Sequence, residues 1–467
     1  MQARPPSLIE LPYHADSAAL FEPFADEHWA VFLDSAHPAG GGRWDILAAR
    51  PYATLVGDDR NGAERGRRPA PEATGDPFAQ LRLALAPRGA RSPLPFAGGA
   101  IGYFAYDLAR RFMRLPGAHK PPCGWPDLAV GLYDWAVLVD HHERRSWFVH
   151  AGRRPMDPAQ RQTLIDRFSR PTPARRRAPF SRRGPLAADF TPQAYRLAFD
   201  RVQAYIRAGD CYQVNLAQRF GCPVAGDPWL AYQVLRRLSP APHSAYLRLP
   251  WGAVLSVSPE RFLQVRAGEV ETRPIKGTRA RSPQPAQDAR LRQELRASAK
   301  DQAENLMIVD LLRNDLGRVC ATGSVRVPQL FQVESYAQVH HLVSTVTGRL
   351  RPDEDALSLL RAAFPGGSVT GAPKLRAMQI IDELEPQRRG VYCGAIGYIG
   401  FDGDMDTSIA IRTLTWQDDR LVFWAGGGLV ADSDPEAEYQ ECLDKAAAVF
   451  RLLDACREPA PHPHARS

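Results

Sequence analysis

The sequence lacks any long apolar segment. None of its hydrophobic runs approaches the roughly 18 to 20 residues that a membrane-spanning helix needs. The start of the chain, MQARPPSLIELPYH, also lacks the apolar core of a signal peptide. We therefore expect a cytoplasmic protein with no membrane association.

Cysteine is scarce and scattered. The seven cysteines form no C-x-x-C pair and have no His-rich segment near them, which argues against a zinc site and against disulfides. None of them lies in a Gly-x-Cys-x-Gly setting typical of a nucleophilic cysteine. We expect reduced thiols that serve mainly as small buried hydrophobes.

Net positive charge is also scarce outside one segment, although the whole chain carries +7. Residues 170–183, RPTPARRRAPFSRR, hold six arginines and no acid, so the rest of the chain is almost neutral. This distribution argues against nucleic-acid binding. The prolines in and around this segment predict a solvated basic linker over 166–188.

The length of 467 residues predicts two domains or one large composite fold. Short apolar runs punctuated by Gly and Pro dominate the N-terminal region, 1–165, and predict strands of an antiparallel sheet. After the linker, 189–458 forms the second region, and 459–467 is expected to be a flexible tail. The pentapeptide Gly-Ala-Ile-Gly-Tyr occurs at 99–103 and again at 394–398, which is weak evidence for two similar strand environments.

Three helices carry start signals. Thr191 is a predicted N-cap followed by proline, Ser298 opens a capping box with Asp301, and Asp434 precedes a proline. The second of these helices carries Glu304, and the third carries Glu438 and Glu441. Each acid alone is typical of a solvated helix face, but three that meet would offer the hard oxygen ligands that Mg²⁺ accepts.

An amine and a carboxyl group stand in two nearby turns. Lys276 lies in Pro-Ile-Lys-Gly-Thr and Glu260 lies in Ser-Pro-Glu-Arg-Phe, sixteen residues earlier. Such a pair can divide a reaction between a nucleophile and an acid. A lysine in such a turn is more often a solvated surface charge, so the pair alone does not establish a site.

Several other positions leave two interpretations open. The loop FPGGSVTGAPK at 364–374 lacks the Lys and Ser or Thr of a phosphate-binding loop, so it is either a carboxylate-binding turn or a structural one. His341 is either a core histidine or an acid–base group. Arg412 interrupts an apolar strand and needs an anionic partner if it is buried.

The strings in the second region resemble the chorismate-utilising enzymes, the family that includes anthranilate synthase component I and isochorismate synthase. GDCYQVNLAQRF, SPERF, RPIKGTRAR, AENLMIVDLLRNDLGRV, HHLVSTVTG, FPGGSVTGAPKLRAM, MDTSIAIRT and AGGGLVADS occur in the family's order over residues 195–453. The N-terminal half matches more loosely. The resemblance implies an α+β fold in which antiparallel sheets pack as a sandwich with helices outside.

Within that family, Lys276 is informative. Anthranilate-forming members have alanine at this position, and isochorismate-forming members have a lysine at the position of Gln213. The combination found here implies amination of chorismate at C4, which yields 4-amino-4-deoxychorismate for 4-aminobenzoate and folate synthesis. An anthranilate-forming enzyme is the alternative, and a non-catalytic chorismate sensor is a third hypothesis from another class.

The resemblance also implies roles for individual residues. Lys276 would attack C2 of chorismate while Glu260 protonates the departing C4 hydroxyl, and His341 would support proton transfer. Desolvation and nearby cations, with Arg273 and Arg279 as candidates, would have to lower the pKa of Lys276. Substrate contacts are implied at Gly277, Thr278, Tyr392, Arg412 and Gly426, Gly427 and Gly428. Mg²⁺ ligands are implied at Glu304, Glu441 and Glu438.

Two further expectations follow from the resemblance. A tryptophan pocket is implied at Ser35, Arg43, Trp44, Asp45, Pro242, His243 and Ser244, although a tyrosine is usual at the position of His243. Because the chain has no glutaminase cysteine, ammonia is expected from a separate glutamine amidotransferase subunit in a heterodimer.

Overall fold

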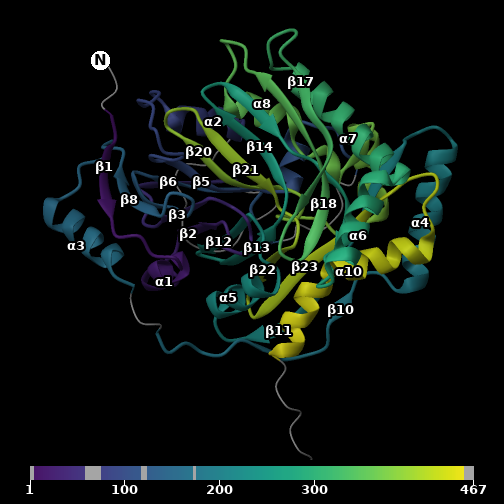
Figure 1. The fold of residues 1–467 in the computed structure, drawn as a ribbon, viewed down its shortest axis with the longest axis horizontal. Coiled ribbons are helices and arrows are strands. Elements are labelled where there is room, and N and C mark those ends of the chain that lie inside the picture. The colour runs from purple at the N-terminus through teal and green to yellow at the C-terminus, as the bar shows by residue number, and fades with distance from the viewer. Residues whose placement is uncertain (1–4, 58–74, 117–123, 172–174, 457–467) are drawn as a thin grey trace, which may run out of the picture.

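The computed structural model describes residues 5–57, 75–116, 124–171 and 175–456. Two large antiparallel sheets dominate this part of the chain (Figure 1). The first has 13 strands, in the order β1 (Ser7–Leu11), β8 (Arg145–His150), β7 (Trp135–Asp140), β3 (Trp44–Ala48), β2 (Ala30–Asp34), β12 (His243–Leu249), β13 (Gly252–Ser258), β22 (Thr413–Gln417), β23 (Arg420–Leu429), β11 (Gln213–Ala225) and β10 (Ala187–Ala188), with β19 (Gly371–Ala372) and β9 (Ser181–Arg182) also paired to β11.

The second sheet has 10 strands. Their order is β16 (Ile275–Ala280), β18 (Val339–Arg349), β15 (Glu269–Thr272), β14 (Arg261–Arg266), β21 (Met405–Ile409), β20 (Ala395–Gly400), β5 (Gly99–Phe104), β6 (Leu128–Tyr133) and β4 (Ala53–Gly57), with β17 (Arg326–Ser335) paired to β18.

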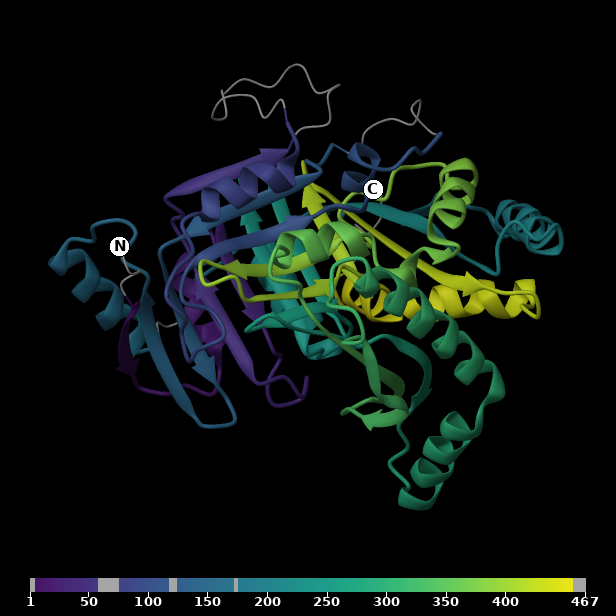
Figure 2. The same ribbon diagram turned by 90° about the horizontal axis from the view of Figure 1, so that it is seen from above.

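Both sheets combine strands from the two ends of the chain. In the first, β2 pairs with β12, and in the second, β5 pairs with β20. Figure 2 shows this mixing, with purple and blue N-terminal strands beside green and yellow C-terminal ones. The predicted boundaries at 166 and 188 therefore mark segments of sequence, while the sheets run through both.

Close packing of neighbouring strands explains the glycines shared by the two copies of the pentapeptide. Its two copies form the adjacent strands β5 and β20, with Gly102 opposite Gly397. A Cβ on Gly102 would lie 2.0 Å from the Ala129 carbonyl oxygen, and one on Gly397 would lie 2.1 Å from that of Asp406. A larger residue at Gly102 or Gly397 would force its strand away from the neighbouring strand.

The sheets pack face to face, with helices on the outer faces. Residues such as Ile46 and Leu247 of the first sheet meet Ile101 and Tyr398 of the second in one apolar cluster between them. The outer face of the first sheet packs against α5 and α10, and that of the second against α7 and α8, while α9 packs against β11 and β19 of the first sheet. The predicted sandwich with outer helices is confirmed.

The helices begin largely where the sequence indicates. Thr191, Ser298 and Asp434 each accept a hydrogen bond from a backbone N–H of the first turn, as predicted. The helices are α1 (Ser17–Phe21), α2 (Pro77–Leu85), α3 (Pro158–Ser169), α4 (Pro192–Arg207), α5 (Pro228–Leu238), α6 (Pro285–Ala297), α7 (Ala299–Gly317), α8 (Ala356–Ala363), α9 (Lys374–Leu384) and α10 (Pro435–Ala455), with 3₁₀ turns η1 (Glu22–Phe24), η2 (Tyr106–Arg111) and η3 (Gly367–Val369).

The basic segment is not solvated throughout. The side chain of Arg177 is 4% exposed and pairs with Glu22, Asp26 and Asp227. The expectation of a solvated linker is wrong at this residue, because three acids from elements distant in sequence converge on it and replace water.

Two sequence expectations concern cysteines and membranes. Cys211, Cys222, Cys320, Cys393 and Cys442 are free and buried, as predicted, whereas Cys456 is partly exposed. Cys123 and the tail 459–467 lie outside the described residues. Among the helices in the described ranges, none is long and apolar enough to cross a membrane.

Candidate active site

Lys276 lies near the start of β16, which pairs with β18 in the second sheet. Its Nζ donates a hydrogen bond to the carbonyl oxygen of Ser368, 3.3 Å away. On the opposite sheet, a Cβ at Gly428 of β23 would lie 3.4 Å from this Nζ and 2.0 Å from Nε2 of Gln213. The amine therefore lies between the two sheets, where glycine leaves room for it.

Burial lowers the pKa of Lys276. Although part of the residue is accessible, the amine is desolvated, and this is the main cause. Glu304 and Glu260 act in the opposite direction, whereas the positive charge of Lys445 lowers the pKa further. A larger fraction of the amine is thus neutral than in water.

The predicted cations are not those that act on Lys276. Arg273 pairs with Glu334, and Arg279 pairs with Asp301 at 3.0 Å. The expectation that these arginines lower the pKa is therefore corrected. Their charges are compensated by their own acids, and Lys445 on α10 supplies the nearby positive charge instead.

Glu260 lies between β13 and β14 and is 5% exposed. Burial raises its pKa to about 7, although a hydrogen bond from the Ser368 side chain and the charge of Lys276 act in the opposite direction. A carboxyl group with this pKa retains a proton near neutral pH and can donate it. The structure brings Glu260 and Lys276 together, and Ser368 touches both.

The loop 364–374 is a compact turn around Ser368. The backbone N–H groups of Val369 and Thr370 donate to Gly366 and Gly367, closing the 3₁₀ turn η3. These donors are used inside the loop, which supports the structural interpretation of its glycines. The loop contributes to the site through Ser368.

Arg412 follows β21 and has a left-handed backbone, with φ of 50°. Burial lowers the pKa of its guanidinium. Within the part of the chain that the structure describes, no carboxylate pairs with this guanidinium. A half-buried, uncompensated cation in a strained conformation is a strong candidate for binding an anionic ligand.

Tyr392 and His341 are both buried near these groups. Tyr392 stacks on Trp424 with ring centroids 6.0 Å apart. His341 Nδ1 lies 2.9 Å from the hydroxyl of Thr278, its partner across β16 and β18. Burial and the charge of Arg412 lower the pKa of His341 to about 3, so the imidazole is neutral at physiological pH.

The three predicted metal ligands face a common region. Burial raises the pKa of Glu304, and the charges of Glu438 and Glu441 raise it further. Lys445 contacts Glu441 at 2.7 Å, and Lys300 lies 3.8 Å from Glu438. Among the described residues, no group of three potential ligands is close enough to hold an ion as arranged. The donor set is nevertheless the hard-oxygen type that suits Mg²⁺, and its mutual repulsion favours a cation.

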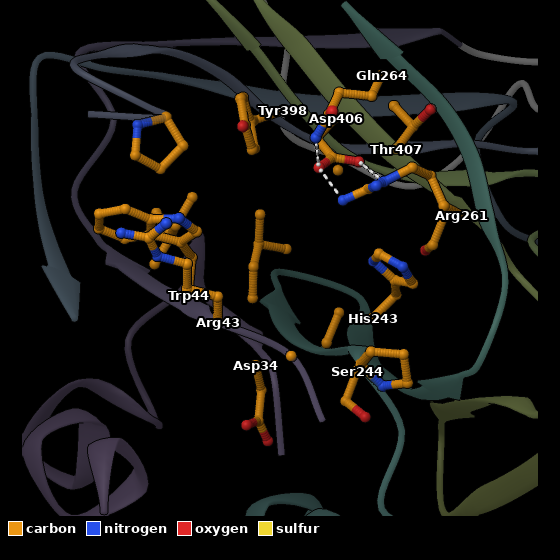
Figure 3. Close-up of a pocket in the computed structure, with 18 of the residues that line it drawn as sticks. Asp34, Arg43, Trp44, His243, Ser244, Arg261, Gln264, Tyr398, Asp406 and Thr407 are labelled. Carbon is orange, nitrogen blue, oxygen red and sulfur yellow. Dashed lines mark hydrogen bonds and ion pairs between the residues drawn. The ribbon is translucent and has the colours of Figure 1, made fainter. Parts of the chain in front are cut away.

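A polar cavity of about 520 Å³ has neither Lys276 nor Glu260 in its lining. Figure 3 shows residues that line it. Five of the residues predicted for a tryptophan pocket line it: Arg43, Trp44, Pro242, His243 and Ser244. Ser35 and Asp45 do not line it. Both are buried, and the Ser35 N–H donates a hydrogen bond to Asp45 Oδ1 at 2.6 Å. Burial lowers the pKa of His243 to about 4.

Sequence reasoning missed part of both sites. Ser368, in the loop that drew attention for its glycines, contacts both Lys276 and Glu260. Arg261 and Tyr398 line the cavity without having been predicted. Arg261 directly follows Glu260, which is a local signal, whereas no signal near Ser368 or Tyr398 indicates what each touches in the fold.

The comparisons with known proteins agree with this geometry. The family model described as chorismate binding enzyme matches residues 31–451. Aminodeoxychorismate synthase component 1 of Klebsiella aerogenes is 48% identical over 457 residues, which is 96% of this chain and 99% of that protein. Anthranilate synthase component 1 of Streptomyces coelicolor is 44% identical over 95% of this chain and 92% of its own length.

The fold is shared with a solved structure. The crystal structure of anthranilate synthase component I from Streptococcus pneumoniae superposes with a TM-score of 0.74 at 33% identity. The match covers 87% of this chain and 91% of that one.

Proposed function

This chain belongs to the family of chorismate-binding enzymes, and on that premise we propose that it replaces the C4 hydroxyl of chorismate by an amino group. The product would be 4-amino-4-deoxychorismate, as the name of its relative in Klebsiella aerogenes indicates. The single observation that carries this proposal is the pair of Lys276 and Glu260, in which desolvation lowers the pKa of the amine and raises that of the carboxyl group. Anthranilate formation is the rival, and amination directly at C2 has no use for such a lysine.

Two displacements account for the chemistry. Neutral Lys276 forms a bond to C2 of the ring, the double bonds shift, and the C4–O bond breaks as Glu260 donates its proton, so that water leaves. The new secondary amine gives its extra proton to the Glu260 carboxylate. Ammonia then attacks C4, the double bonds shift back, and the C2–N bond to Lys276 breaks as Glu260 returns that proton to the lysine nitrogen. The ammonium group formed at C4 releases one proton, which restores the protonated carboxyl of Glu260.

The substrate is a dicarboxylate and needs cations or N–H donors. The unpaired guanidinium of Arg412 supplies one such charge, and the backbone of Gly426 to Gly428 offers close approach on the other side. Tyr392 and the backbone of Gly277 would complete the walls. His341, neutral and bonded to Thr278, supports the position of that hydroxyl.

A magnesium ion is part of the proposal. Glu304, Glu441 and Glu438 would hold it, with Lys445 and Lys300 turning away from the two acids they now contact. When bound, Mg²⁺ supplies positive charge that screens a substrate carboxylate. Isothermal titration of Mg²⁺ into the wild type and into Glu304→Gln tests this directly, and equal binding by both proteins would refute the assigned ligands.

Ammonia would come from a partner. The relatives named component 1 suggest a second component, and we assign it as a glutamine amidotransferase subunit. Turnover with glutamine should require that subunit, whereas turnover with an ammonium salt should not. Glutamine-dependent turnover by this chain alone would rule out the assignment.

The deciding experiment identifies the product. The purified chain is incubated with chorismate, Mg²⁺ and an ammonium salt, and the products are separated and weighed by mass spectrometry. We expect 4-amino-4-deoxychorismate. Anthranilate, isochorismate or salicylate as the main product, or no turnover, would overturn the proposal.

The polar cavity would bind a free amino acid, with tryptophan as the expected ligand. Its volume of about 520 Å³ lies in the usual range of ligand pockets, and it combines Trp44 and prolines with charged groups. Calorimetric titration with tryptophan and, for comparison, phenylalanine measures this. If neither amino acid gives a heat of binding, the proposed ligand of the cavity is wrong.

A further inference from the structure

A buried ion pair lies directly behind the loop that carries Ser368. Arg389 is 1% exposed and Glu385 is 3% exposed. The guanidinium donates to both carboxylate oxygens, at 2.9 Å from Nε and 2.6 Å from Nη2. It also lies over the ring of Tyr106, 4.7 Å from its centroid.

The pair completes an edge of the first sheet. Along β11, β19 pairs only with residues 213–214 and β10 only with 220–221, which leaves the backbone between them without a strand. Glu385 accepts a hydrogen bond from the N–H of Ala217 at 2.9 Å, and Arg389 donates to the carbonyl of Asn215 at 2.6 Å. The ion pair thus replaces a missing strand at this position.

The same guanidinium also holds the loop. Its Nη1 donates to the carbonyl of Val369 at 2.8 Å. The preceding residue, Ser368, accepts a hydrogen bond from Lys276 through its carbonyl and bonds to Glu260 through its side chain. Arg389 therefore fixes the loop against β11, the strand that carries Gln213. The bonded loop residue, Val369, is next in sequence to Ser368, which contacts both reactive groups.

We propose that Arg389 and Glu385 form a positioning pair for the amination reaction: they set the place of Ser368, and through it the alignment of Glu260 and Lys276. The inference rests on the proposed function, since it assigns a reaction to those two groups.

Stability alone does not explain this pair. Burying two charges costs several kcal/mol per ion, and apolar residues of similar volume often stabilise a protein as well or better. What apolar residues cannot do is bond a strand carbonyl, a strand N–H and a loop carbonyl in one fixed arrangement. The planar fork of arginine does so, and the single ammonium of lysine cannot span the same partners.

The test is a double-mutant cycle between Arg389→Lys and Ser368→Ala. The hydrogen bond from Ser368 lowers the pKa of Glu260, so its loss should raise that pKa. Each single variant should move the alkaline limb of the kcat/KM profile to higher pH and lower kcat by about 10- to 100-fold, with KM changed by less than about threefold. The double variant should show no larger shift than the single ones, because both act through one contact.

A matched control separates positioning from stability. Arg177→Lys also removes a buried fork that holds three acids, in a different part of the fold. It should lower the unfolding temperature and leave the pH profile in place. If Arg389→Lys does the same, or if its effect adds to that of Ser368→Ala, the positioning role is wrong.

A gentler variant decides the question if Arg389→Lys does not fold. Glu385→Gln keeps the volume and an acceptor for Ala217 while weakening the hold on Arg389. It should move the alkaline limb in the same direction, and an unchanged profile would overturn the inference. Wild-type protein that makes no 4-amino-4-deoxychorismate would instead overturn the proposed function, so the two failures are distinct.

Discussion

The Lys276 site and the polar cavity differ in how their charged side chains are paired. In the cavity, each arginine has an acid: Arg43 pairs with Asp140, Arg261 with Asp406, Arg266 with Asp404, and Arg273 with Glu334. At the Lys276 site, burial lowers the pKa of Lys276 and raises that of Glu260, and Arg412 has no acid among the described residues.

This difference separates two tasks. Paired ions are already stable, so the cavity is ready to bind a ligand and release it without any change of protonation. Uncompensated buried groups are costly, and such groups cluster where a protein performs chemistry on a charged substrate. The comparison therefore favours catalysis at the Lys276 site and ligand binding in the polar cavity.

The most severe way to test this assignment is Lys276→Ala. Loss of the nucleophile should lower kcat about 10⁴-fold or more. The folded protein should lose little stability, because the removed amine is desolvated and its ionisation is suppressed. Rates come from mass-spectrometric product analysis and stability from thermal unfolding. Amination at the wild-type rate would eliminate the covalent step.

Glu260→Gln tests the difference between the two regions through the pH dependence of kcat/KM. The pKa of Glu260 is raised to about 7, so the alkaline limb of kcat/KM in the wild type should fall as pH rises through that value. The variant should lose about 10²- to 10³-fold in rate and lack that limb. A limb that persists near pH 7 in the variant would belong to another group.

The same carboxyl group links stability to pH with a defined sign. Its pKa is higher in the folded protein than the ordinary value of 4.5, so the folded state holds the proton more tightly than the unfolded chain. The resulting stability is full below about pH 4.5 and is lost as pH rises to about 7. Denaturant unfolding of Glu260→Gln should lack this part of the decline.

Local signals in the sequence predicted local structure well. The caps at Thr191, Ser298 and Asp434 depend on a few neighbouring residues, and all three form as expected. The pairing of β5 with β20 joins segments almost 300 residues apart, and no local pattern specifies it. The sandwich was predictable only because the whole series of strings resembles a known family.

The site divides in the same way. Lys276 and Glu260 stand in strings that resemble the family, and that resemblance predicted their shared site. The expected turn at Lys276 is wrong, because the residue lies in strand β16. Ser368, Lys445 and Arg389 act through contacts that exist only in the folded chain. Lys445 in particular pairs with Glu441 on its own helix, yet its charge also lowers the pKa of Lys276.

Gln213→Leu tests whether a polar side chain beside Lys276 lowers the free energy of unfolding of the protein. Both polar atoms of the Gln213 side chain are buried without a hydrogen-bond partner in the described structure. Leucine should therefore raise the free energy of unfolding by about 1 to 2 kcal/mol, while the rate falls about tenfold because the wall beside Lys276 changes. Chemical denaturation and product analysis measure the two effects.

A paired glutamine supplies the control for that variant. Gln203 is also buried, but its Nε2 donates to the carbonyl of Val430 at 2.8 Å. Gln203→Leu should lower stability, since it leaves that acceptor unpaired. Equal destabilisation by both leucines would show that Gln213 has a partner in solution and that the contrast between them is absent.

The smallest effect is expected from Arg43→Ala in the cavity. The guanidinium donates from Nε to Asp140 Oδ1 at 2.9 Å, and its side chain is 43% exposed. Backbone N–H groups of His142 and Glu143 also bond to Asp140, so its charge stays partly compensated and the loss in stability should be below about 1 kcal/mol. Chorismate turnover should stay within about twofold, whereas tryptophan affinity, measured by calorimetry, should fall about tenfold. A large loss of turnover with unchanged tryptophan binding would mean that the cavity takes part in the reaction, and the division between the two regions would be wrong.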